Sequence, residues 1–204
     1  MTQFESINPN RWSSIPLLML VASGQSAGMI SRDLLARIPA IAINDSWKLA
    51  PHAEILYAAD APWWRYHDYV HQFSGERWTQ DRGAAGWPEE AEEHGIHVIK
   101  SLPLSGVSTN HSTLHTGSNS GFQALNMAIL GGAKRIALVG YDMGGPHWFG
   151  DHPGHLNRSS PYGTFRKAFE EAAEQISSLN VEVFNCSKQS SLTCFPLADL
   201  RDLL

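Results

Sequence analysis

Residues 16–26, PLLMLVASGQS, decide the fold that this sequence predicts. The run from Pro16 to Ala22 is apolar throughout, as in a strand that is buried on both faces of a parallel sheet. Ser23 and Gly24 open a turn, and a helical pattern of apolar residues follows over 29–38. A buried strand, a turn and a helix in this order form the first unit of an α/β domain.

The same unit recurs along the chain. Residues 74–94 look irregular and then helical and acidic, and residues 101–121 form a long polar loop. We therefore expect one Rossmann-like α/β domain over residues 1–204, with a parallel sheet of about six strands and helices on both faces. The further predicted strands are 39–43, 53–59, 97–99, 135–139 and 181–184, and the further predicted helices are 62–73, 164–179 and those that begin near Phe122 and Leu197.

Composition excludes several classes of protein. The chain has 204 residues, of which 43% are hydrophobic and 17% charged, so it can bury a core and is not a disordered tail. A formal net charge of −5 gives no general attraction for nucleic acids or anionic membranes. The longest apolar run is far shorter than the roughly 20 residues of a membrane span, and the first residues do not resemble a signal peptide. We expect a cytoplasmic protein in which Cys186 and Cys194 are thiols.

Ligands of parallel sheets bind at the carboxyl ends of the strands, which makes the residues that end the predicted strands candidates for a site. Most of these residues are small or polar, which predicts a polar cleft along one edge of the sheet. Small residues at 23–26 would let the backbone approach a phosphate, although a plain tight turn explains them as well. The strand ends are 23–26, 44–45, Asp60, 140–142 and Asn185.

Two later segments could contribute binding or catalytic side chains to this cleft. Residues 116–121 close the polar loop and open a helix, so Ser118 or Asn119 suits the N-cap, and the neighbouring polar groups would face phosphate or sugar oxygens. Residues 147–155 hold His147, Asp151, His152 and His155, which suit acid–base work near neutral pH, structural hydrogen bonds or metal binding. Because Pro and Gly residues interrupt this segment and leave no fixed ligand spacing, we expect no bound metal.

Seven segments, in this order, resemble motifs of the bacterial sialyltransferase-like proteins, especially the short versions found in bacteriophages and prophages. They span nearly the whole chain. They are VASGQS (21–26), AINDSW (42–47), LYAAD (56–60), GSNSG (117–121), IALVGYD (136–142), HWFGDH (147–152) and NCSKQSSL (185–192).

The resemblance implies a domain that binds a nucleotide or nucleotide-sugar without an obligatory metal or other cofactor. It implies that a histidine, His147 or His152, is the catalytic base. The implied nucleotide-binding residues are Gly24, Ser26, Asn44, Asp60, Ser118, Asn119, Ser120, Gly121 and Asp142.

The implied function is glycosyl transfer from a nucleotide-sugar to an unidentified acceptor, and the oligomeric state stays open. Only four residues separate Asp142 from His147, where the sialyltransferases insert a lid that bears tyrosines. Two other functions therefore stay open. One is nucleotide binding without turnover, and the other is pyrophosphoryl transfer, as in the more distantly similar pterin diphosphokinase-like family.

Overall fold

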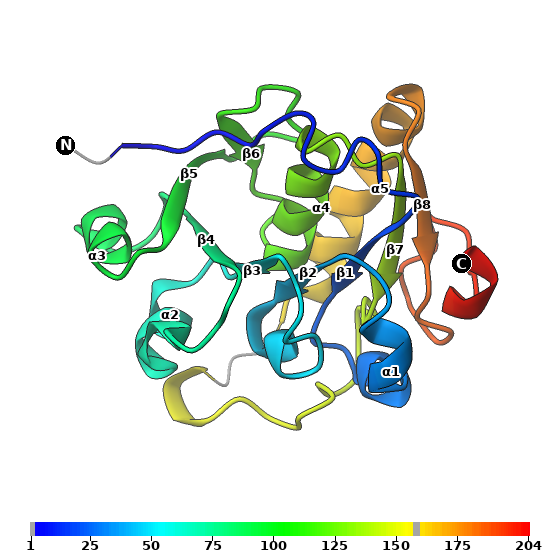
Figure 1. Ribbon diagram of the computed structural model, residues 1–204, viewed down its shortest axis with the longest axis horizontal. Coiled ribbons are helices and arrows are strands. Elements are labelled where there is room, and N and C mark those ends of the chain that lie inside the picture. The colour runs from blue at the N-terminus through cyan, green and yellow to red at the C-terminus, as the bar shows by residue number, and fades with distance from the viewer. Residues whose placement is uncertain (1–2, 157–159) are drawn as a thin grey trace.

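The computed structural model describes residues 3–156 and 160–204, and its strands form one open sheet (Figure 1). Eight strands lie in the order β6-β5-β4-β3-β2-β1-β7-β8, and every neighbouring pair is parallel. The Rossmann-like parallel sheet is confirmed, with two strands more than expected. The strands are β1 Leu18–Val21, β2 Ala40–Ile43, β3 Ile55–Tyr57, β4 Glu76–Gln80, β5 His97–Leu102, β6 Thr113–His115, β7 Arg135–Val139 and β8 Glu182–Asn185.

Helices cover both faces of the sheet. The α-helices are α1 Arg32–Leu35, α2 Ala61–Tyr66, α3 Trp87–Glu93, α4 Ser120–Leu130 and α5 Tyr162–Ser178. Short 3₁₀ helices are η1 Gln25–Met29, η2 Asn44–Lys48, η3 Asp68–Val70, η4 Gly154–Leu156 and η5 Leu200–Leu203. Among the described residues, no helix has both the length and the apolar character that crossing a bilayer requires.

The order of the strands reverses at β1, which is the third strand from the β8 edge of the sheet. It runs outward from β1 to the edge strand β6 and then returns to place β7 on the free side of β1, where Leu18 pairs with Ile136. In open α/β sheets the crevice beside such a switch point is where ligands bind. The topology therefore predicts a ligand-binding site at the carboxyl ends of β1 and β7.

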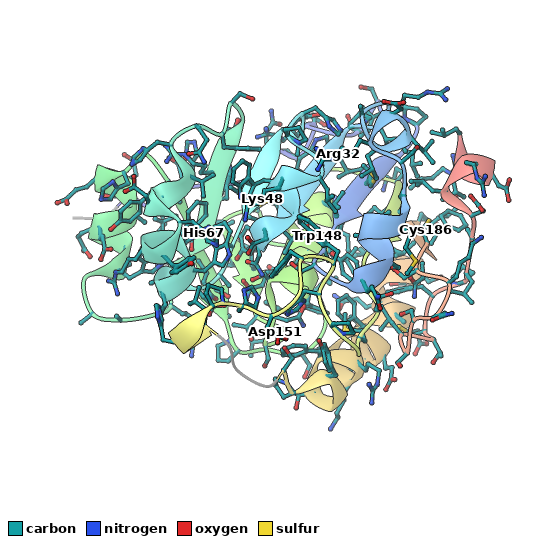
Figure 2. All side chains as sticks on the ribbon, turned by 90° about the horizontal axis from the view of Figure 1, so that it is seen from below. Arg32, Lys48, His67, Trp148, Asp151 and Cys186 are labelled. Atoms are coloured by element: carbon teal, nitrogen blue, oxygen red, sulfur yellow. The ribbon has the colours of Figure 1, made fainter. Side chains whose placement is uncertain are left out.

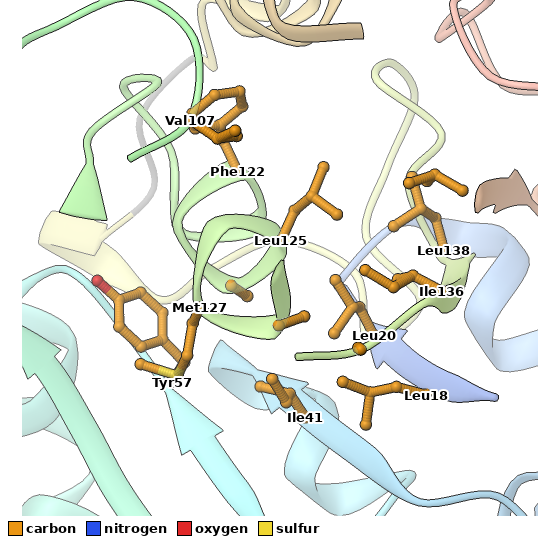
Figure 3. Close-up of a cluster of buried hydrophobic side chains, with 14 of the residues drawn as sticks. Leu18, Leu20, Ile41, Tyr57, Val107, Phe122, Leu125, Met127, Ile136 and Leu138 are labelled. Carbon is orange, nitrogen blue, oxygen red and sulfur yellow. The ribbon is translucent and has the colours of Figure 1, made fainter. Parts of the chain in front are cut away.

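Two hydrophobic clusters flank the central strands. Leu18 and Leu20 of β1 face α4 and α5, and Figure 3 shows them beside Leu125 of α4. Met19 and Val21 face the other way, toward the side that α1, α2 and α3 cover. Because every residue of β1 and β2 is buried, their continuous apolar sequence follows from contact on both faces.

Two strands were missed because their sequences are polar. β4, with the sequence ERWTQ, lies in the segment predicted to be irregular, and β6 lies inside the predicted polar loop. β5 also extends three residues beyond the predicted strand, to Leu102. In these outer strands only some residues contact the core, as Leu114 does in β6, so the apolar signal is weak.

Three helix predictions were too long. The helix predicted over 62–73 ends at Tyr66 and gives way to a left-handed turn, in which φ is +47° at Asp68, +54° at Tyr69 and +50° at Val70. Arg77 Nη1 donates to the Tyr69 carbonyl, and Val70 is fully buried, so tertiary contacts hold this strained turn. The helix predicted over 29–38 is a 3₁₀ turn followed by the single-turn α1, and the last helix begins only at Leu200.

A buried asparagine on α4 holds the polar loop against the sheet. Asn126 Oδ1 accepts hydrogen bonds from the backbone N–H groups of Ser108 (2.9 Å) and His115 (3.0 Å), and Asn126 Nδ2 donates to the Ser108 carbonyl (3.0 Å). Gln175 of α5 makes a similar pair of bonds with the backbone of Val107. These side chains replace the ladder bonds that a longer strand would make.

We expect Asn126→Ala to lower the free energy of unfolding by at least about 2 kcal/mol, because it leaves several backbone N–H and C=O groups without hydrogen-bond partners. Gln175→Ala, at a half-buried position where water can replace the amide, should cost less. Urea unfolding of both variants measures the two losses. Equal losses would contradict the role given to Asn126.

Candidate functional site

The turn after β1 fits closely against the end of β7. Gly24 donates its backbone N–H to the Gly140 carbonyl (2.9 Å), and a Cβ at Gly24 would lie 2.0 Å from Asp142 Oδ2. Asp142 Oδ2 also accepts a hydrogen bond from the backbone N–H of Ser26 (3.0 Å). Position 24 is therefore restricted to glycine by the approach of neighbouring atoms, and the Asp142 carboxylate anchors the turn.

A cleft of about 400 Å³ opens beside this turn, at the carboxyl ends of the strands. It brings together most of the residues that the sequence singled out. Those lining it are Gly24, Asn44, Asp60, Ser118, Asn119, Ser120, Gly121, His147 and His152. Ser26 and Asp142 do not line it, and they face a separate cavity on the other side of the turn.

Three residues of the cleft carry buried polar atoms that have no hydrogen-bond partner among the described residues. These atoms are Ser23 Oγ, Asn44 Oδ1 and His152 Nδ1. Asn44 has a φ of +49°, in the left-handed region that asparagine tolerates better than most residues. Buried polar atoms are normally paired, so three unpaired ones around one cleft indicate that a polar ligand completes it.

The N-terminus of α4 forms another wall. Asn119 is the N-cap: its Oδ1 accepts from the Phe122 N–H (2.8 Å), and its Nδ2 donates to the Gly117 carbonyl (2.8 Å). Ser120 Oγ accepts from the Ala59 N–H (3.2 Å) and so fixes the helix to the end of β3. These two side chains have structural roles. The first N–H groups of the helix, which have no intrahelical acceptor, are what α4 offers to an anion in the cleft.

The histidine segment is tied to the turn through its backbone. His147 forms a bridge with Gly24, and the Trp148 N–H donates to the Ser23 carbonyl (3.1 Å). Figure 2 looks onto this edge of the sheet, with Trp148 near its middle. The rings of His147 and His152 lie 4.8 Å apart between centroids, so the two candidate bases are neighbours within one wall.

Burial and neighbouring positive charge favour the neutral form of the His152 ring. Burial lowers its pKa below the usual 6.5, and the proximity of His147 and His67 lowers it further. A neutral ring with an unpaired nitrogen can accept a proton from a bound group. The structure thus gives His152 the form that a general base requires.

Asp45, next to Asn44, organises the floor of the cleft. Burial acts to raise its pKa, but the His67 ring, with Nε2 at 3.5 Å from Oδ1, and hydrogen bonds from Lys48 and Trp63 outweigh burial and hold the pKa well below its usual range. Lys48 Nζ lies 2.6 Å from Asp45 Oδ1, and Trp63 Nε1 donates to Asp45 Oδ2 (2.9 Å). The Asp45 carboxylate therefore holds Trp63, which lines the cleft.

Sequence reasoning missed several aromatic residues of the cleft. Trp63 comes from α2, and Tyr162 and Phe165 come from the start of α5. The seven tryptophans of the chain are a compositional signal for the first, since large rigid aromatic rings are common in ligand clefts. Tyr162 and Phe165 gave no signal, because they look like the apolar face of an ordinary amphipathic helix.

Among the described residues, no three His, Cys, Asp or Glu side chains gather in a way that could hold a metal ion. The absence of a bound metal stays a prediction. Cys186 and Cys194 are free thiols, and burial raises the pKa of Cys186 to about 12.

No family model and no curated protein sequence matches this chain. Solved structures of a sialyltransferase are similar to it. The sialyltransferase CstII from Campylobacter jejuni, in complex with a substrate analogue, cytidine-5′-monophosphate, aligns with a TM-score of 0.54 and 14% identity over 91% of this chain and 86% of that one. CstII in complex with a trisaccharide acceptor and CMP aligns with a TM-score of 0.51 and 13% identity over 89% and 86%.

The fold is sialyltransferase-like. At this identity the likeness concerns the fold, and it covers nearly all of both chains. The arrangement of strands and helices in this chain is thus one that a sialyltransferase also has.

The environment of His152 predicts a pH dependence. With a lowered folded pKa, the unfolded state binds more protons, so the contribution of His152 to stability is present above pH 6.5 and is lost as pH falls from there through the folded pKa. We expect an NMR titration of the ring protons to show that the pKa of His152 is below the usual 6.5. His152→Gln should flatten the loss of stability below pH 6.5, and an unchanged slope would contradict the assignment.

Proposed function

We propose that this protein is a nucleotide-sugar-dependent glycosyltransferase whose cleft binds the donor. The observation that carries the proposal is the convergence of three unpaired polar atoms, on Ser23, Asn44 and His152, with the N-terminus of α4 around one cleft. The likeness of the fold to CstII structures described with CMP supports a nucleotide as the ligand. The phosphate would lie against the first N–H groups of α4, where the helix dipole favours negative charge.

The proposed reaction needs one base and no redox change. An acceptor hydroxyl attacks the anomeric carbon of the donor sugar, a new C–O bond forms, and the bond from that carbon to the phosphate oxygen breaks. The electron pair of the broken bond stays on the phosphate, which the α4 N–H groups stabilise. The hydroxyl proton goes to a histidine, and the neutral, unpaired His152 suits this role better than the adjacent His147.

Several residues of the cleft would bind the donor without taking part in proton transfer. Trp63, Tyr162 and Phe165 offer flat apolar surfaces for a base or a sugar ring. Asn44 Oδ1 and Ser23 Oγ are suited to hydrogen bonds with hydroxyl or amino groups. Asp45 keeps Trp63 in place through the indole N–H.

Nucleotide binding is tested by removing the Asn44 side chain without changing its backbone. Asn44→Gly keeps a residue that accepts positive φ, so we expect CMP to bind about 1–3 kcal/mol more weakly, roughly five- to 150-fold in Kd, with the fold intact. The matched control is Asn180→Gly, an exposed asparagine with a φ of +56° outside the cleft. Calorimetry that finds equal CMP affinity in both variants would refute the assigned cleft.

Turnover is tested by the release of nucleotide from CMP-N-acetylneuraminic acid and then from UDP- and GDP-sugars. His152→Ala should lower kcat by about 10²–10⁴-fold and leave CMP affinity nearly intact. His111→Ala, at an exposed position away from the cleft, should change neither. If His147→Ala alone abolishes turnover, the base is His147. If wild-type protein binds CMP but turns over no donor, the protein sequesters a nucleotide, a function that the short segment between Asp142 and His147 would also fit.

A further inference from the structure

A second cavity, of about 730 Å³, lies on the opposite side of the Gly24 turn from the cleft. It is bounded by η1 and α1, by the segments that follow β7 and β8, and by η5. Successive residues of one turn line different cavities: Gly24 lines the cleft, and Gln25 and Ser26 line the second cavity. The proposed transfer reaction uses none of the side chains of this cavity.

Two polar groups in its wall are free to bind a ligand. Asp142 Oδ2 accepts the Ser26 N–H, but no described residue donates a hydrogen bond to Asp142 Oδ1. Ser26 Oγ is buried and has no partner among the described residues. Because both residues line this cavity, a carboxylate oxygen and a hydroxyl in one wall suit a ligand that donates hydrogen bonds and can also accept one.

The charges around the cavity disfavour ions of either sign. An anion would face the Asp142 carboxylate. A cation would have to pass Lys188 and Arg201, whose exposed side chains both contact Asp199, at 3.4 Å and 2.7 Å. The four charged residues of the lining sum to zero, so no net field selects a charged ligand.

The remaining lining is half apolar and half uncharged polar. Met29, Ile30, Leu34 and Leu200 supply the apolar part, and Met29 is 75% exposed. Gln25 and Gln189 add amide groups, which both donate and accept. A sugar ring presents this same combination, with hydroxyl groups around its edge and apolar C–H groups on its faces.

We propose that the second cavity is a binding site for a neutral saccharide, distinct from the donor cleft. The hydroxyl groups of the sugar donate to Asp142 Oδ1 and exchange hydrogen bonds with Ser26 Oγ, and the ring lies on the wall that includes Met29. The inference does not depend on the proposed function, because it requires neither turnover nor a nucleotide.

Methionine methyl groups report on the two sites separately. Met29 lines the second cavity and Met143 lines the cleft, while Met19 and Met127 are buried in the core. In protein labelled with ¹³C at the methionine methyls, glucose, galactose, N-acetylglucosamine and lactose are titrated one at a time, and CMP is titrated separately. We expect at least one sugar to shift the Met29 signal in a saturable way while Met143 stays in place.

Ser26→Ala should weaken that binding about three- to tenfold, because it removes one hydroxyl and leaves the backbone N–H bond to Asp142. Ser177→Ala, at an exposed position on α5, is the matched control and should bind as wild type. The proposal is overturned if none of the four sugars shifts Met29, if the sugars shift Met143 instead, or if Ser26→Ala binds as tightly as the control. Failure of CMP to shift Met143 would count against the donor cleft alone.

Discussion

The close contact of Gly24 with Gly140 and Asp142 is the constraint on which the functional edge of the sheet depends. The backbones approach so closely that no side chain fits at position 24, and the Asp142 carboxylate closes the contact by accepting the Ser26 N–H. His147 then bridges to Gly24. This one contact between the ends of β1 and β7 thus fixes the turn, the start of the histidine segment and the wall between the cleft and the second cavity.

The polar side chains of the molecule divide into two groups by how they are satisfied. In the first group, the side chains form hydrogen bonds with backbone groups that would otherwise be unpaired, and they hold α4, β3 and the polar loop together. This group includes Asn119, Ser120 and Asn126. Ser23 and Asn44 have buried oxygens without partners in the described part of the chain. Since unpaired buried groups cost stability, a polar ligand or water that pairs with these two oxygens would offset that cost.

The sequence predicted the strands that are buried on both faces better than those that contact the core only in part. β1, β2 and β7 are buried on both faces, so their apolar runs are unambiguous, whereas β4 and β6 carry polar residues and contact the core only in part. The early end of α2 was not predictable, because its left-handed turn is held by Arg77 and by the burial of Val70, which are distant or tertiary contacts. Local propensity carries no information on such contacts.

The site was predictable to a similar degree. Strand ends must meet at one edge of a parallel sheet, so Gly24, Asn44 and Asp60 were found from topology alone. Ser26 and Asp142 line the second cavity and not the cleft, because the direction of a side chain in a tight turn depends on backbone angles that the residue types leave open. Trp63 and Tyr162 reach the cleft from helices whose placement only the complete fold determines.

The reversal of strand order at β1 has a consequence for how the chain folds. During synthesis, β1 can pair with β2 early, but its other edge has no partner until β7 emerges, because Leu18 pairs with Ile136. An apolar strand edge that is paired inside the final sheet therefore lacks its β7 partner for most of translation. Such late, long-range pairing slows folding and invites association between nascent chains, so this protein should depend on chaperones that shield strand edges more than a sheet built in sequence order would.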